Sequence, residues 1–476
     1  MPRPGVTVEI TDEVFAGAAV LDTGQSFMVG KAEKGSAVAA TKIRSMKEYA
    51  KWFGTRAGGS SLHDGASTFF DEGGGTLYVA RAIGTGAIPA FTTALGTQLR
   101  YEAVSPGVWG NSLKVKANAP PAGVSGIYLT VLDAANSDAL LDQSPPVTTP
   151  QDLINWSIGR PYVAITATGG APVLPSPPNV VTLSGGADGA APGDTEYVNA
   201  LGLFGFELGP GQVSMPGMTT IAKQNGMMQH CLDNFRVCIL DLPDDPTLAA
   251  LSAAIGAIYA HEGSKHALAC GSWLVYPYSA SGSSVVVPYS GVQSGLIARA
   301  DKLGDPSVNA AGVNGISRRA IGLHYQRTDA DRETLNDLGV CLAKQVYGQV
   351  RTYGYRVAAG PSEENWRFFQ ESRVVMSIAH RCNAAMEEFV FNAIDGRGHL
   401  FAKIHGVLMG ICSEFFLANA LYGAQPEDAF QVDVAGQNTV ETIALGEVHA
   451  SVKVKTSKSA EWVEINLVKT PLERTF

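Results

Sequence analysis

Both ends of this chain alternate like β-strands, and neither has an obvious partner next to it in the sequence. Near the start, apolar Val6, Val8 and Ile10 alternate with polar residues, which is the period of a strand with one buried face. A lone strand of this length is not stable in water, and an unpaired edge invites another chain to complete it. The pattern therefore predicts that residues 4–10 pair with a strand that lies elsewhere.

The end of the chain repeats this alternation in two runs separated by a short polar turn. The apolar positions of the two runs are Val448, Ala450, Val452, Val454, Val463, Ile465 and Leu467. The stretch after the first strand, residues 11–25, has glycines at positions 17 and 24 and is long enough to span roughly 40 Å when extended. We therefore expect residues 1–25 to form an arm.

Composition excludes several classes of function. Charged residues make up only 17% of the chain, which indicates a surface that is largely covered by protein, and the formal net charge is −9. Because nucleic-acid binding needs a basic face, this balance argues against a general nucleic-acid binder. We see no signal-peptide pattern and no run of about 18 apolar residues, so we expect no direct membrane insertion.

The cysteines show no metal or redox motif. There are six, none in a Cys-x-x-Cys pair: Cys231, Cys238, Cys270, Cys341, Cys382 and Cys412. Scattered cysteines without ligand spacing favour buried, reduced thiols over a zinc site. We therefore expect no cofactor and no metal.

The first third of the chain changes from α/β to β-rich character. A buried strand, "SFMVGKAEKG", precedes a helix whose capping box is Ser45 and Glu48 and whose stop is Gly54. A second helix, "SLHDGASTFFDEGGG", and a strand, "TLYVARA", follow. From about Pro89 short alternating strands dominate, as in "NSLKVKANAP", "GIYLTVLD" and "YVAITATG".

The α/β pattern then returns, which predicts that the β-rich stretch is an insertion. "NFRVCILDLP" reads as a buried strand that ends at Asp241, "TLAALSAAIGAIYAHEG" as a helix, and "HALACGSWLVYP" as one more strand. Past residue 315 the patterns predict mainly helices. Two are expected in "DRETLNDLGVCLAKQVYG", with a stripe from Leu335 to Val346, and in "ESRVVMSIAHRCNAAMEEFVF".

In their order along the chain and in their residues, these segments resemble the contractile tail sheath proteins of myophages, R-type bacteriocins and related injection systems. The resemblance runs through nine phrases, from "PGVTVEI" and "FMVGKAEKG" with "SMKEYAKWFG", through "LHDGASTFFDEGGGTLYVARA", "VWGNSLKV", "LSGGADG", "VCILDLP", "VPYSGVQSGLIARAD" and "ESRVVMSIAHRCNAAMEEFVF", to "ALYGAQPEDAFQV". Two segments depart from the family pattern. The Gly-Pro that usually follows the first buried strand is replaced by "KGSAVAAT". The segment "DKLGDPSVNAAGVNG" lacks the aromatic residues and the Lys-Pro-Ala sequence of the family.

The resemblance implies a non-enzymatic polymer. Sheath subunits of this family stack as hexameric rings in a helical sheath around a tail tube protein, associate with baseplate and tail terminator proteins, and shorten to drive the tube through a cell envelope. It implies assembly in a host cytoplasm and residence in the virion tail. A phage sheath and a bacteriocin or injection-system sheath stay open as alternatives.

The resemblance also implies the domain plan and the exchange of strands between subunits. The ranges are 1–25 for the N-terminal arm, 26–95 with 187–315 for a discontinuous α/β middle domain, 96–186 for an outer β-rich domain, 316–460 for an α+β inner domain, and 461–476 for the C-terminal arm. Strands carrying Val6, Val8 and Ile10, and Val463, Ile465 and Leu467, would be added to a neighbour's sheet. Val448, Val452 and Val454 would belong to the acceptor sheet.

One group of basic residues is a candidate for contact with an acidic tube. Arg373 and Arg381 fall on the face of the 371–391 helix opposite its apolar stripe, and Lys403 lies in the following segment. The alternative is a solvated face, or one paired within the subunit, because surface charges contribute only about 0 to 1 kcal/mol.

An enzyme reading rests on Asp241. Open α/β sheets place catalytic acids at the carboxyl ends of buried strands, so a self-associating, hydrolase-like α/β enzyme is the alternative from another class. However, "DLPDDP" is also an ordinary turn sequence. "GQSFMVGKA" has the wrong spacing for a phosphate loop, and the five-residue step of "HEGSKH" places His261 and His266 on different helix faces.

Overall fold

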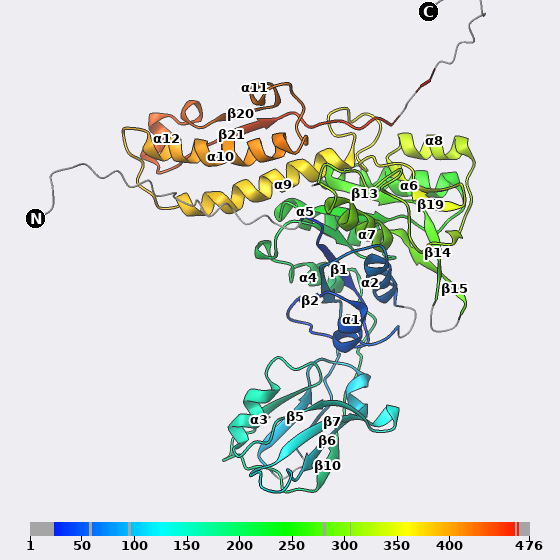
Figure 1. Ribbon diagram of the computed structural model, residues 1–476, viewed down its shortest axis with the longest axis vertical. Helices are drawn as coiled ribbons and strands as arrows, with labels where there is room; N and C mark the ends of the chain where they lie inside the picture. Colours follow the sequence, from blue (N-terminus) through cyan, green and yellow to red (C-terminus); the bar gives the residue numbers. More distant parts are fainter. Residues whose placement is uncertain are drawn as a thin grey trace, which may run out of the picture.

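The computed structural model describes residues 23–56, 60–93, 97–278, 282–304, 306–461 and 464–465. Figure 1 shows a central body, a lobe at one end of the long axis, and a layer of two long helices at the other end. The protein is a mixed α/β structure with several sheets.

A seven-stranded sheet forms the centre of the body. Its order is β17-β13-β12-β11-β1-β3-β2, and every neighbouring pair is parallel except β2 with β3. The strands are β1 (Ser26–Gly30), β2 (Thr41–Ile43), β3 (Leu77–Arg81), β11 (Gln212–Ser214), β12 (Val237–Asp241), β13 (Ala267–Cys270) and β17 (Val340–Cys341). β1, β11, β12 and β13 are buried at every position, as expected for parallel strands covered on both faces.

Helices cover both faces of this sheet. Phe27 and Val29 point into a core shared with α4, α5, α6 and α8, whereas Met28 points into one shared with α1 and α2. α7 is buried along almost its whole length. The helices are α1 (Met46–Phe53), α2 (Ser61–Asp71), α4 (Asp194–Leu201), α5 (Ile221–Asp233), α6 (Leu248–Ile258), α7 (Tyr289–Asp301) and α8 (Asp329–Asp337).

The lobe has its own hydrophobic core and two antiparallel sheets, β10-β6-β7-β8 and β4-β5-β9. Its elements are β4 (Phe91–Thr92), β5 (Leu99–Ala103), β6 (Leu113–Asn118), β7 (Tyr128–Asp133), β8 (Ala139–Gln143), α3 (Pro150–Ser157), β9 (Val163–Ala167) and β10 (Asn179–Thr182). The chain enters and leaves it side by side, because Ile88 pairs with Ala187 and Phe91 with Ser184.

Two expectations about the body are wrong. "HALACGSWLVYP" is two strands, β13 and β14 (Trp273–Pro277), and β14 joins β15 (Ser284–Pro288) and β16 (Gly322–Leu323) in another sheet. "DRETLNDLGVCLAKQVYG" is helical only through α8. It continues as β17 and β18 (Ala343–Val346), and β18 pairs with β19 (Gln349–Thr352).

Gly339 explains the second difference. Its φ of +85° lies in the left-handed region, which ends a helix and favours glycine. A Cβ at this position would stand 2.3 Å from the carbonyl oxygen of Val357. The helical spacing of Leu335, Leu338 and Leu342 therefore spans a helix, a turn and a strand.

The remaining chain forms the helical layer. α9 (Phe369–Met386) and α10 (His399–Leu417) run side by side (Figure 1) and share one apolar cluster with β20 (Phe430–Asp433) and β21 (Ser451–Val454). Two short helices, α11 (Pro426–Ala429) and α12 (Val440–Ala444), complete it. By length and composition α10 is long and apolar enough to cross a membrane, and 33% of its apolar window is buried inside the protein.

Candidate inter-subunit surface

The two-stranded sheet of β20 and β21 contains two of the predicted acceptor residues, Val452 and Val454, and Val448 lies just before β21. β21 pairs antiparallel with β20, with Val452 opposite Val432 and Val454 opposite Phe430. Val448, Val452 and Val454 all pack against the cluster that α9 and α10 share. The period-2 pattern therefore placed these three valines on one face, and that face is turned toward the long helices.

The outer edge of β21 has no strand beside it in the described part of the chain. The backbone N–H of Lys455 donates to the carbonyl of Ala429 at 2.8 Å, which fixes the alternation of the ladder. Because antiparallel strands direct successive N–H and C=O groups to opposite sides, those of Val452 and Val454 point away from β20. Such an edge is a template for another strand.

The predicted exchange strands lie mostly outside the described residues. This holds for Val6, Val8 and Ile10 in the N-terminal arm and for Val463 and Leu467 in the C-terminal arm. Ile465 is described, and 84% of its surface is exposed.

The start of the described chain is anchored in the body. Thr23 Oγ1 donates to a carboxylate oxygen of Asp301 at 2.8 Å. The side-chain amide of Gln25 donates to the carbonyls of Leu208 and Pro210 at 2.6 and 2.7 Å. Residues 23–25, which the sequence assigned to the arm, therefore belong to the packed body.

The chain after β21 crosses back over the start of α9, and we call residues 455–461 the C-terminal strap. Thr456 donates to Glu371 at 3.1 Å, and Ser459 accepts from Gln370 at 2.9 Å. At the end of the strap, Arg356 holds the carboxylate of Glu461 through contacts of 2.6 to 3.1 Å. The strap thus joins the helical layer to the body.

Arg373 does not present its charge to a partner. Its residue is 3% exposed, and its guanidinium contacts both carboxylate oxygens of Asp301, at 2.8 and 2.6 Å. A second donor reaches the carbonyl of Pro306 at 3.2 Å. The expectation that Arg373 faces a tube is corrected, because its charge is neutralised inside the subunit.

The other two basic candidates differ from each other. Arg381 pairs with Glu414 and lies over the ring of Phe415 at 5.4 Å, so it links α9 to α10. Lys403 is exposed on α10, and among the described residues no carboxylate lies within ion-pair distance of its ammonium. Of the three, Lys403 alone keeps an available charge.

Sequence reasoning missed the residues that anchor the two arms. Asp301, Arg356 and Glu461 carry no local signal, because each finds its partner far along the chain. Asp301 and Arg373 are 72 residues apart, and Arg356 and Glu461 are 105 apart. Only covariation between these positions would have revealed them.

Asp241, the basis of the enzyme reading, is a structural residue of the interior. It is 1% exposed, and its carboxylate accepts from the backbone of Gly217 and Ser290, both at 2.9 Å, and from the Ser290 hydroxyl at 2.5 Å. Burial raises the pKa of this carboxyl to about 6, against the hydrogen bonds that lower it. The carboxylate thereby fixes the start of α7.

The two histidines of "HEGSKH" have separate structural roles. His261 caps a turn by accepting from the N–H of Gly263, whereas His266 contacts Ser372 of α9 at 2.7 Å. Within the described ranges, no group of three or more His, Cys, Asp or Glu side chains is placed to hold a metal. All six cysteines are free, and only Cys382 is not fully buried.

The comparisons with known proteins bear on the fold. No family model and no curated protein matches the chain. Among solved structures, the sheath tail protein from Listeria innocua is 15% identical with a TM-score of 0.63, covering 92% of this chain and 96% of its own. The sheath tail protein from Desulfitobacterium hafniense is 15% identical with a TM-score of 0.58, covering 90% and 93%.

A third similar structure comes from an assembled sheath. The PVC sheath complex of an extracellular contractile injection system, in its contracted state, is 14% identical with a TM-score of 0.58, and covers 100% of this chain and 99% of its own. Each of the three likenesses covers at least 90% of this chain. The chain therefore has the fold of the contractile tail sheath proteins.

Proposed function

We propose that the chain is the structural, non-enzymatic subunit of a contractile tail sheath, which polymerises around a tube and shortens to drive that tube through a cell envelope. The observation that carries this proposal is the open edge of β21, which stands in a fold that matches sheath proteins over nearly its whole length. Both ends of the chain have the alternating sequence of a strand, and an open edge of this kind pairs with an added strand.

Strand addition explains how a weak joint makes a stable polymer. Main-chain bonds give affinity, and alternating side chains such as Val6, Val8 and Ile10 fix the register. Burying each of these contributes about 1.5 to 3 kcal/mol and each ladder bond about 1, against about 1 to 2 kcal/mol per ordered residue. One joint is therefore weak, and many in a closed lattice are strong.

The proposed domain roles follow the long axis of the molecule. The layer of α9, α10, β20 and β21 is the inner part, next to the tube, and the lobe at the opposite end is the outer part (Figure 1). The α/β body connects them. Since β17 joins the central sheet, the inner part begins nearer α9 than residue 315.

The proposed partners are other copies of this chain, a tube protein, and the baseplate and terminator proteins that close the two ends of a tail. A phage tail is the proposed setting, with residence in the virion. A bacteriocin or injection-system sheath is the alternative, and the PVC complex favours it. Capsid genes beside the gene for this chain would decide for a phage.

Negative-stain microscopy of the full chain and of a chain lacking residues 1–10 tests the proposal. The full chain should form hollow cylinders. The shortened chain should stay monomeric with an unchanged circular dichroism spectrum, and a peptide of residues 1–12 should compete with cylinder formation by the full chain. Cylinders formed equally well without residues 1–10, or discrete small oligomers from the full chain, would contradict the proposal.

We also propose that Lys403 contacts an acidic tube surface, because its charge is exposed and unpaired in the described chain. Lys403→Glu should weaken binding to the purified tube and flatten its dependence on salt. Lys458→Glu, which reverses an exposed charge on the strap, is the matched control. Equal binding by both variants would refute this contact.

A further inference from the structure

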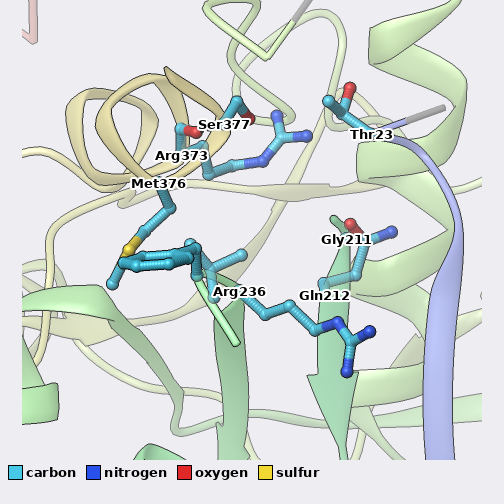
Figure 2. Close-up of a pocket in the computed structure, with 9 residues that line it drawn as sticks. Thr23, Gly211, Gln212, Arg236, Arg373, Met376 and Ser377 are labelled. Atoms are coloured by element: carbon cyan, nitrogen blue, oxygen red, sulfur yellow. Dashed lines mark hydrogen bonds between the residues drawn. The ribbon is translucent and has the colours of Figure 1, made fainter. Parts of the chain in front are cut away.

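The anchors of the two arms meet at one place. We call this place the arm-root junction, and it consists of Thr23, Asp301, Asn309, Gln370, Arg373 and Ser459. Figure 2 shows Arg373 extending from α9 toward Thr23, where the described chain begins. Thr23, the anchor of the N-terminal arm, donates to Asp301. Ser459, the anchor of the C-terminal strap, accepts from both Asn309 and Gln370.

The side chain of Arg373 lies between the residues that hold Thr23 and those that hold Ser459. Arg373 contacts Asp301, which holds Thr23, and also the carbonyl of Pro306, in the connection that leads to Asn309. Arg373 and Gln370 are less than one turn apart on α9, and both are nearly fully buried. A shift of α9 therefore moves Gln370, the donor to Ser459, together with Arg373, the partner of Asp301.

Beside the junction lies a small cavity that Thr23 and Arg373 both line. The cavity beside it, between β11, β12 and α9, measures about 10 Å³ and is lined by Thr23, Gln212, Arg236, Arg373 and Ser377 among others (Figure 2). This is the space of about one water molecule. Because packed interiors pass on strain instead of damping it, a movement of Thr23 reaches Arg373 through Asp301, which both residues contact.

The Asp301–Arg373 pair resists separation. Both side chains are buried, at 7% and 2% exposure, and separating a buried pair leaves an uncompensated charge. Displacements that separate the two side chains are therefore opposed.

We propose that the arm-root junction couples the two arms, so that displacement of the N-terminal root loosens the C-terminal strap and the reverse. Its use in a sheath rests on the proposed function, since there each arm is held by a different neighbour. Release of one arm would then weaken the hold on the other, and a change at one subunit would pass to the next. The coupling itself is a property of the single chain.

Hydrogen exchange of the single chain, with its N-terminal strand deleted to keep it monomeric, tests the coupling. Thr23→Val removes the hydroxyl that reaches Asp301 and keeps the shape. We expect the amides of residues 455–459 to exchange about three- to tenfold faster, which lies in the lower part of the range of coupling between residues of one network. Ser459→Ala should reciprocally speed exchange at residues 24–27.

Thr55→Val is the matched control, because it removes an exposed hydroxyl bonded to Glu33, away from the junction. It should leave both segments unchanged. Should Thr23→Val alter exchange only near residue 23, with the strap behaving as in Thr55→Val, the coupling is refuted. That outcome is independent of cylinder formation, which tests the proposed function.

Discussion

The ammonium of Lys34 lies 4.4 Å from the centre of the Tyr162 ring and 5.3 Å from that of Trp109. Lys34 follows β1 of the body, whereas both rings belong to the lobe. Nearby, Arg81 of the body donates to the carbonyl of Pro106 at 2.8 Å. The orientation of the lobe is therefore set by cations of the body held among aromatic rings and carbonyls of the lobe.

The first prediction is that this contact titrates near pH 8. Burial lowers the pKa of Lys34 to about 8, below its value in an unfolded chain. Between the two values the unfolded chain binds more protons, so stability from this group rises with pH. Trp109 fluorescence should change with a midpoint near 8 in the wild type, and not in Lys34→Met.

Lys34→Arg serves as the control, because a guanidinium keeps its charge over the rings throughout this pH range. Trp109→Phe identifies the reporter among the six tryptophans of the chain. A titration that persists in Lys34→Met would assign the change to another group.

The second prediction concerns the neck between body and lobe. A Cβ on Gly84 would stand 1.9 Å from the carbonyl oxygen of Ala190, where the two connecting segments run together. Gly84→Ala should therefore force these segments apart and cost about 1 to 3 kcal/mol of unfolding free energy, as overpacking does. Limited proteolysis should show faster cleavage between residues 82 and 91.

Gly256→Ala is the control for this prediction. Gly256 lies within α6, and nothing stands within 4 Å of a Cβ there. The same substitution should leave proteolysis unchanged and raise stability by up to about 1 kcal/mol, because alanine favours a helix over glycine. If both variants are equally stable, the close approach at Gly84 is not limiting.

Local signals explain which parts of the fold were predictable. α1 begins where its capping residue predicts, since Ser45 accepts from the N–H of Glu48 at 3.2 Å. The stretch up to Val346 was misread because its apolar spacing fits a helix while Gly339 breaks it. The spacing of apolar residues indicates the type of a helix or strand. It does not show where a contact with distant residues ends that helix or strand.

The residues of the candidate surface also divide into those that the sequence predicts and those that it does not. The shared face of Val448, Val452 and Val454 follows from a two-residue period, which the sequence displays. The burial of Arg373 depends on Asp301, 72 residues away, and a single sequence does not show that pairing. Charges on the polar face of a helix are thus ambiguous until the packing of the whole chain is known.

The third prediction concerns Glu72, a carboxylate with 0% exposure at the end of α2. It accepts from the Tyr276 hydroxyl at 2.5 Å, the Arg318 N–H at 2.9 Å and Arg299 at 3.3 Å. Glu72→Gln replaces an acceptor by a donor and leaves Arg299 without its charge partner. We expect a loss of about 3 kcal/mol or more.

Tyr276→Phe separates charge from hydrogen bonding in that network. It removes one donor and keeps the ring, so urea unfolding should show a smaller loss of about 1 to 3 kcal/mol. A Tyr276→Phe loss equal to that of Glu72→Gln would mean that the ion pair contributes nothing.

The fourth prediction is a pH dependence that originates at Asp241. Its pKa in the folded chain is about 6, above the value of an unfolded aspartate. Between these values the folded chain binds the extra proton, so stability from this group is greatest at low pH and is lost as pH rises through 6. Asp241→Asn keeps a carbonyl acceptor and cannot titrate.

Urea unfolding of both proteins at pH 4, 5.5 and 7 isolates this term, because all other groups titrate alike in the two. The stability of the wild type relative to Asp241→Asn should fall by about 2 kcal/mol from pH 4 to 7. In Ser290→Ala, which loses the hydroxyl donor to the carboxylate, the fall should be larger in total and continue to higher pH. A difference that stays constant, or that grows with pH, would show that the hydrogen bonds from Gly217 and Ser290 outweigh burial and hold Asp241 ionised at the start of α7.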